Sequence, residues 1–370
     1  MRLPYPCPDP ARSLAIDWAS LDAPWIAELA ACPQDPEHHA EGDVWTHTKM
    51  VCEALVHLPE WQALPEGERE LVFAAALLHD IAKPACTRIE DGRIRQPGHS
   101  LRGAAMLRAM LWRAGAPPRV REAIAGLVRH HQVPFFLIDH ADPRRRLAAL
   151  SQVARCDHLA LLTRADALGR ITRDPQRLLD NIDLFTALAE GEGCDRAPFA
   201  FPSDHTRFLY FRDEGRDPHT LAFDDTRCEV VVMSGLPGSG KDRWIRDNLD
   251  LPVISLDGIR DELDMPATGE QGAVINAARD RAREHLRRGE PFVWNATCLG
   301  RDIRRRIIDL CAAYRARVRL VYIEVPRARL LQQNRARAAV VPEAAIERMT
   351  RLWEPPDATE AHRVDWILAQ

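Results

Sequence analysis

A glycine-rich stretch in the C-terminal third of the chain constrains the fold most strongly. It follows an apolar run, residues 229–234, that is typical of a buried strand, and it precedes residues 241–249, which have a helical pattern. A strand, a glycine-rich loop and a helix in this order form a phosphate-binding loop, because backbone N–H groups and the helix N-terminus point toward phosphate oxygens. We therefore predict that a nucleoside triphosphate binds to the loop residues Gly235, Leu236, Pro237, Gly238, Ser239, Gly240, Lys241 and Asp242.

One position of this loop departs from the usual pattern. The residue after the lysine is normally Ser or Thr, whose hydroxyl binds Mg²⁺, but this chain has Asp242. Either the carboxylate serves Mg²⁺ directly or through a water molecule, or phosphate transfer is impaired.

Net charge, cysteine spacing and apolar runs limit the class of protein to which this chain can belong. The net charge of −4 is too mild to identify a partner. The nine cysteines are scattered without a C-x-x-C pair, which argues for reduced thiols and a cytoplasmic location rather than a disulfide framework or a cysteine zinc site. The chain has no apolar run of membrane-spanning length and no signal-peptide core, so we expect no membrane association.

Lysine is rare in this chain, and its positions are informative. The basic residues are almost all arginine, and the only lysines are Lys49, Lys83 and Lys241. A chain with this preference should keep lysine where a compact ammonium group is required. Lys241 in the loop and Lys83 are the candidates, whereas we interpret Lys49 as an exposed helix residue.

The hydrophobic pattern divides the chain into two domains. Helical periodicity predicts an all-α domain over residues 1–195, with an irregular lead-in over residues 1–40. Strands and helices alternate over residues 228–370, which predicts an α/β domain with a parallel sheet. We interpret residues 196–227 as a connector whose aromatic side chains pack the domains together, with stacking on nucleic-acid bases as the alternative.

The predicted all-α domain contains a His-Asp pair, His79-Asp80, at the end of an apolar helix. Burying such a pair is costly unless a divalent metal ion takes both side chains as ligands. Lys83 is at helical spacing from both residues, so it can reach an anion bound at the metal. Further candidate ligands follow the chain order His47, His99, His130, His131 and Asp166, and Arg170 lies one turn after Asp166.

This ordered set resembles the HD phosphohydrolase superfamily in its two-metal form. The resemblance implies that one divalent metal ion is held by His47, His79, Asp80 and Asp166. It also implies that Asp80 bridges to a second ion, which is completed by His99 and by His130 or His131. Adjacent helical residues point about 100° apart, so we expect only one of these last two to be a primary ligand.

Two such metal ions support hydrolysis of a phosphate ester, because they activate a bridging water molecule and stabilise charge on the phosphoryl oxygens. Lys83 and Arg170 would hold the remaining oxygens. The residues do not distinguish Mn, Ni, Co, Fe or Mg as the metal. We interpret the other histidines, His39 among them, as structural or solvated.

Polar residues follow the predicted strands of the C-terminal domain. Asp257 ends the strand over residues 252–256, Arg260 follows it, and Asn295 and Thr297 end a later strand. An α/β fold places its chemistry at the carboxyl ends of parallel strands. There Asp257 can accept the proton of an attacking hydroxyl group, and Arg260 can hold a phosphate of the acceptor.

The C-terminal domain resembles the P-loop polynucleotide kinases. The features that carry the resemblance are the loop with Lys241, the Asp257-x-x-Arg260 pair and an arginine-bearing lid over residues 329–337. The resemblance implies that Asp257 is the general base for a 5′-hydroxyl group and that Arg260 binds the adjacent phosphate. It also implies that the donor phosphates are clamped by Arg335 and Arg337.

An HD phosphohydrolase followed by such a kinase resembles the bacterial HD-Pnk family of RNA end-healing enzymes. The resemblance implies removal of 2′,3′-cyclic, 3′- and 2′-phosphates, and Mg²⁺-dependent transfer of the γ-phosphate of an NTP to a 5′-hydroxyl of RNA or DNA. The products would be ends ready for an RNA ligase, the implied functional partner.

Three alternatives remain open from the sequence. The chain could join an HD nucleotide hydrolase to a kinase for a nucleoside or sugar. It could be a nucleotide sensor in which Asp242 has abolished transfer, or only the HD half could be active.

Overall fold

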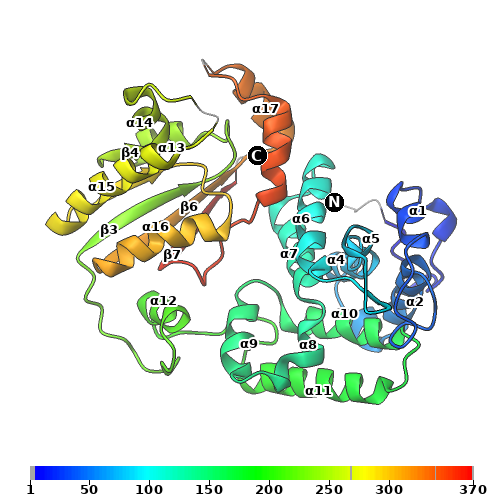
Figure 1. Cartoon of the computed structure of the whole chain (residues 1–370). Coiled ribbons are helices and arrows are strands. Elements are labelled where there is room, and N and C mark those ends of the chain that lie inside the picture. Colours follow the sequence, from blue (N-terminus) through cyan, green and yellow to red (C-terminus); the bar gives the residue numbers. More distant parts are fainter. Residues whose placement is uncertain (1–4, 267–268, 338, 369–370) are drawn as a thin grey trace. The chain divides into compact units, whose positions relative to one another are not determined.

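The computed structural model describes residues 5–266, 269–337 and 339–368. The chain divides into two compact units, Met1–Ala200 and Phe201–Gln370, whose elements are labelled in Figure 1. The second unit begins inside the segment that we interpreted as a connector. Among the described residues, no helix combines the length and the apolar character needed to cross a membrane.

The N-terminal unit is helical apart from one short hairpin, in which β1 (Arg88–Glu90) pairs antiparallel with β2 (Arg93–Arg95). Residues 72–78 of α4 are all buried, as the apolar sequence predicts, and α4 packs against α2, α7 and α10. The helices are α1 (Trp25–Ala30), α2 (Val44–Val56), α3 (Pro59–Gln62), α4 (Glu66–Leu78), α5 (Lys83–Cys86), α6 (His99–Arg113), α7 (Pro118–His130), α8 (Val133–Phe136), α9 (Pro143–Ser151), α10 (Cys156–Leu168) and α11 (Pro175–Gly191), with 3₁₀ turns η1 (Trp18–Ser20) and η2 (Leu137–Asp139).

Two local features shape the start of α2 and its contact with α10. The Asp43 side chain caps α2 by accepting hydrogen bonds of 2.8 Å from both the backbone N–H and the hydroxyl of Thr46. Gly169 ends α10 so close to α2 that a Cβ atom there would lie 2.6 Å from the backbone nitrogen of Val51. Only glycine permits this approach, which brings the last turn of α10 beside the first turns of α2.

The C-terminal unit contains a five-stranded, fully parallel sheet in the order β4-β5-β3-β6-β7. This architecture confirms the predicted fold class. Residues 230–234 of the central strand are all buried, as expected for a parallel sheet covered on both faces. The strands are β3 (Cys228–Ser234), β4 (Val253–Ser255), β5 (Phe292–Asn295), β6 (Ala316–Glu324) and β7 (Arg363–Leu368). The helices are α12 (Asp204–Arg212), α13 (Lys241–Asn248), α14 (Leu256–Glu262), α15 (Gly272–Arg288), α16 (Arg301–Ala313), α17 (Arg327–Arg335) and α18 (Glu343–Met349), with the 3₁₀ turn η3 (Thr350–Leu352).

Helix α12 lies within the segment that we interpreted as a connector, and it packs on the C-terminal unit. The ring of Phe208 is buried and stacks on the imidazole of His362 with a centroid distance of 3.9 Å. His205 Nδ1 lies 3.0 Å from His362 Nε2. Phe208 therefore belongs to the core of this unit, whereas Phe223 is 87% exposed.

Candidate functional site

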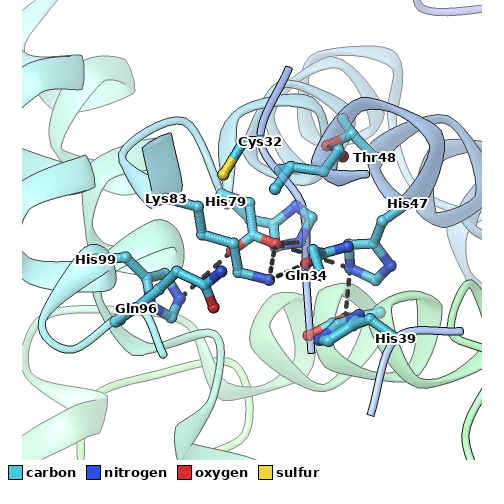
Figure 2. A network of polar contacts seen from close by, with 12 residues as sticks. Cys32, Gln34, His39, His47, Thr48, His79, Lys83, Gln96 and His99 are labelled. Carbon is cyan, nitrogen blue, oxygen red and sulfur yellow. Dashed lines mark hydrogen bonds and ion pairs between the residues drawn. The ribbon is translucent and has the colours of Figure 1, made fainter. Parts of the chain in front are cut away.

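Four histidine side chains surround the carboxylate of Asp80 in the N-terminal unit, and three of them are labelled in Figure 2. The Nε2 atoms of His79 and His47 lie 3.1 and 3.8 Å from Asp80 Oδ2. The Nε2 atoms of His99 and His131 lie 3.3 and 3.9 Å from Asp80 Oδ1. Each carboxylate oxygen thus faces its own pair of imidazoles.

Backbone carbonyl groups face Nδ1 of all four rings, and for His47 this is the carbonyl oxygen of Gly169 at 3.2 Å. Nδ1 of His79, His99 and His131 lies 2.7, 2.8 and 2.8 Å from the carbonyl oxygen three residues earlier in the chain. A carbonyl oxygen only accepts, so each Nδ1 carries the proton and each Nε2 presents its lone pair to the Asp80 side. This arrangement is typical of metal-binding histidines.

Asp166 and Arg170 complete the His47 side of this cluster. His47 Nε2 lies 3.1 Å from Asp166 Oδ1, and Arg170 donates hydrogen bonds of 2.7 Å to both carboxylate oxygens of Asp166. Burial alone would raise the pKa of Asp166, but Arg170 and His47 hold it well below its ordinary value. The Arg170 guanidinium also lies over the ring of Phe135 at 5.0 Å.

Lys83 reaches the cluster across a turn rather than along one helix. Helix α4 ends at Leu78, and Lys83 begins α5. The Lys83 ammonium is buried, lies 2.7 Å from Asp80 Oδ2 and donates a hydrogen bond of 2.6 Å to Gln34 Oε1 (Figure 2). The predicted proximity is present, but the predicted continuous helix is not.

The structure places the adjacent histidines at the end of α7 differently. The His131 side chain is 1% exposed and lies with His99 and Asp80, whereas that of His130 is partly exposed and is not in this group. Burial lowers the pKa of His131 to about 3. His131 is therefore neutral near pH 7, which is the form that binds metals.

Sequence reasoning missed Glu41, which contacts two histidines. Glu41 Oε1 lies 2.8 Å from Nδ1 of both His39 and His47, and Glu41 Oε2 accepts a hydrogen bond of 2.9 Å from the backbone N–H of Ile171. Burial lowers the pKa of His39 to about 4, although its contact with Glu41 opposes this shift. Both residues lie before α2, in a segment without helical periodicity to mark them. The bridge between Pro33 and Asp43 folds this segment back, and the backbone N–H of Ala40 donates a hydrogen bond of 3.0 Å to the carbonyl oxygen of Ile171.

The cluster fits a divalent metal ion by its donor atoms. Within the described ranges, His47 Nε2, His79 Nε2 and Asp80 Oδ1 are buried without a hydrogen-bond partner. Such atoms are costly unless a cation binds them. The arrangement offers two ligand groups that share Asp80, one with His47 and His79 and the other with His99 and His131.

The glycine-rich loop of the C-terminal unit has the strained geometry that its sequence predicts. Gly235 has φ 149°, and a Cβ atom there would lie 2.5 Å from the carbonyl oxygen of Ile323. Lys241 Nζ donates hydrogen bonds of 2.9 and 3.1 Å to the carbonyl oxygens of Gly235 and Leu236. Burial lowers the pKa of Lys241 to about 8. The lysine thus lies over the loop, where phosphates would bind.

Two polar pairs lie at the carboxyl ends of strands beside this loop. Asn295, the last residue of β5, donates a hydrogen bond of 2.6 Å to Asp242 Oδ1. Asp257 lies in the first turn of α14, and Arg260 Nη1 donates to its Oδ1. Arg260 Nε also donates to Gln271 Oε1 at 2.9 Å. The side chain of Asp257 is 73% exposed, so an acceptor can reach it from solvent.

The two predicted clamp arginines differ in placement. Arg335 pairs with Glu343 of α18 at 2.7 Å and is largely exposed, so this structure does not bring it to the loop. Arg337 is partly buried, and its charge helps to lower the pKa of Lys241, after the larger effect of burial. Helix α17 itself packs on the loop, because a Cβ atom at Gly238 would lie 3.2 Å from the carbonyl oxygen of Leu330.

Comparison with protein-family models agrees with both sites. Residues 44–171 match the HD domain, and residues 230–356 match an AAA domain. The chain contains an HD domain followed by a P-loop AAA domain. The HD domain holds the histidine and aspartate cluster, and the AAA domain holds the glycine-rich loop and both strand-end pairs. The architecture thus combines an HD phosphohydrolase domain with a P-loop kinase-like domain.

The chain is similar over part of its length to a tRNA nucleotidyltransferase and to a Multifunctional CCA protein. It is 38% identical over 110 residues to the CC-adding tRNA nucleotidyltransferase of Thermus thermophilus, covering 29% of this chain and 24% of that protein. It is 34% identical over 158 residues to the Multifunctional CCA protein of Cupriavidus metallidurans. This match covers 40% of this chain and 34% of that protein. The chain thus spans a quarter to a third of the length of these relatives. A gluconokinase structure from Sinorhizobium meliloti matches 39% of this chain and 85% of its own, with 18% identity and a TM-score of 0.29.

Proposed function

We propose that this chain is a bifunctional enzyme that heals the ends of broken RNA or DNA strands. The HD domain would remove 2′,3′-cyclic, 3′- and 2′-phosphates. The P-loop domain would transfer the γ-phosphate of an NTP to a 5′-hydroxyl group. The 3′-hydroxyl and 5′-phosphate ends that result are substrates for a ligase, so we expect cooperation with an RNA ligase.

The observation that carries the proposal is the presence of both chemistries in one chain. The carboxylate of Asp80 faces two separate pairs of imidazoles, and Asp257 stands exposed next to Arg260 beside the phosphate loop. Cleavage of RNA through its 2′-hydroxyl leaves a cyclic phosphate on one side and a 5′-hydroxyl on the other. A hydrolase and a kinase together repair these two ends.

In the HD domain, His47, His79, Asp80, Asp166, His99 and His131 would hold the divalent metal ions. Bound there, the metal ions would supply an activated water molecule and neutralise the charge of the phosphate. Lys83 and Arg170 would each contact phosphate oxygens, because their cationic groups lie beside Asp80 and Asp166. Burial of this cluster excludes bulk water, which strengthens these charge interactions.

In the P-loop domain, Lys241 and the loop would bind the donor phosphates with Mg²⁺. Asp257 would accept the proton of the attacking hydroxyl group, and Arg260 would orient the acceptor through its phosphate. The exposure of Asp257 favours a large acceptor that approaches from solvent over a small molecule in an enclosed pocket. The tRNA in the name of the Thermus relative supports an RNA substrate.

Two labelled substrates test the proposal with purified protein. We expect a 5′-hydroxyl oligonucleotide to gain label from γ-labelled ATP and Mg²⁺, and an oligonucleotide with a 2′,3′-cyclic phosphate to lose it with Mn²⁺, Ni²⁺ or Co²⁺. Asp80→Ala should abolish only the second reaction, and Lys241→Ala only the first. Labelling of a nucleoside or gluconate but of no oligonucleotide would identify a small-molecule kinase. Tight ATP binding without transfer to any acceptor would indicate a sensor.

A further inference from the structure

We propose that Asp242 is a direct Mg²⁺ ligand of the nucleotide site and that Asn295 holds its carboxylate in position. The inference rests on the proposed kinase function. It means that this loop presents a negatively charged ligand where the usual loop presents a neutral hydroxyl group.

The contact between these side chains is built by the sheet rather than by the loop. Asn295 is 8% exposed at the carboxyl end of β5, which pairs with β3, the strand that leads into the loop. The backbone N–H of Gly235 donates to the carbonyl oxygen of Thr297 at 3.0 Å. This pairing places the Asn295 amide beside the first turn of α13, where it donates to Asp242 Oδ1 at 2.6 Å.

A second observation concerns the only hydroxyl group of the loop. Ser239 is 2% exposed, and within the described residues its Oγ atom is buried without a hydrogen-bond partner. This Oγ atom lies 2.8 Å from where a Cβ atom of residue 235 would stand, so it lies against Gly235 inside the loop. The oxygen that the first turn of α13 offers is therefore the carboxylate of Asp242.

The chemistry of the pair fits Mg²⁺. The donor from Asn295 is a neutral amide that bonds to Oδ1, so Oδ2 can serve a cation. Mg²⁺ prefers hard oxygen ligands and usually binds through one or two carboxylates together with substrate phosphates. The charge has a measurable consequence, because without a divalent cation the carboxylate repels a bound triphosphate. A unit charge a few ångströms away changes an affinity by about fivefold even in water.

The experiment compares ATP affinity in EDTA and in Mg²⁺ by calorimetry, using the full chain. Asp242→Asn removes the charge and keeps the shape. We expect this variant to bind ATP in EDTA about fivefold or more tightly than the wild type, and the gain from Mg²⁺ to shrink about tenfold. The matched control is Asp247→Asn, which removes an exposed carboxylate from the same helix. It should leave both affinities within about twofold of the wild type.

A second variant tests the role of Asn295. Asn295→Ala keeps the carboxylate of Asp242 but removes the amide that holds it in position. ATP affinity in EDTA should therefore stay near the wild-type value, while the gain from Mg²⁺ falls severalfold. An equal gain from Mg²⁺ in the wild type and in Asp242→Asn would overturn the inference and leave the kinase function standing. Failure of the wild type to bind ATP under either condition would overturn both.

Discussion

The carboxylate of Glu41 lies 2.8 Å from Nδ1 of His47. The same Nδ1 atom also lies 3.2 Å from the carbonyl oxygen of Gly169. Together these two contacts direct His47 Nε2 toward Asp80 and Asp166, because the imidazole can turn only by losing them. Glu41 also accepts from the backbone N–H of Ile171, so it connects the lead-in segment to the end of α10. A carboxylate behind a metal-binding histidine raises the basicity of the ligand and fixes its orientation.

Glu41→Gln should therefore weaken metal binding without removing a ligand. We expect the affinity of the HD domain for Mn²⁺ to fall by about 10- to 100-fold, which is the usual effect of losing such a partner. Glu37→Gln changes an exposed carboxylate of the same segment and serves as the control. Metal titration followed by calorimetry compares the two variants, and equal affinities would show that Glu41 does not support the ligand.

The adjacent histidines of α7 provide a second test. His131→Ala should reduce the tightly bound divalent metal from two ions to one per chain, because it removes a ligand from the group that contains His99 and Asp80. His130→Ala should retain both ions. Elemental analysis after dialysis measures the ratio. Loss of metal in His130→Ala alone would reverse the assignment.

Gly169→Ala should destabilise the HD domain by about 1–3 kcal/mol, the usual cost of forcing extra atoms into a packed region. The new methyl group would lie 2.6 Å from the backbone nitrogen of Val51, which cannot move without shifting α2. Gly191→Ala, at the end of α11, meets no atom within 4 Å and should change stability by less than about 1 kcal/mol. Urea unfolding measures the free energy of unfolding of both variants. The difference between these two free energies should vanish if α2 moves freely.

His362 should make the C-terminal unit sensitive to acid. Burial, with smaller effects from Arg317 and His205, lowers the pKa of His362 to about 3. Its Nδ1 accepts a hydrogen bond of 3.0 Å from the backbone N–H of Val318, which protonation would break. Because the pKa in the folded state is below the unfolded value of about 6.5, the stabilisation is complete above pH 6.5 and is lost as the pH falls toward 3.

We expect this loss to reach about 3 kcal/mol by pH 4.5. His362→Asn keeps an acceptor but does not titrate, so its stability should depend less steeply on pH over this range. The exposed His219 provides the control, His219→Asn. Thermal unfolding at pH 7.0, 5.5 and 4.5 gives the dependence of stability on pH. The same dependence in His362→Asn and in the wild type would show that His362 does not cause the acid sensitivity.

The sequence by itself determined the elements whose evidence is local. The apolar run before Gly235 and the glycines after it predict a strand and a phosphate loop, since both depend on neighbouring residues alone. Alternating strands and helices over residues 228–370 predict the parallel sheet, which is present. The His79-Asp80 pair likewise marks the HD domain, because a buried pair of this kind needs a compensating cation.

Only the tertiary structure decided which distant residues complete each site. His47 and Asp166 lie 119 positions apart, and they meet because Gly169 lets α10 approach α2. The segment before α2 has no periodicity to reveal Glu41, which acquires its role only when the chain folds back. Asn295 and Asp242 are 53 residues apart and meet through the pairing of β5 with β3. Hydrophobic patterns report which face of an element is buried, but contacts between polar side chains depend on how the elements pack.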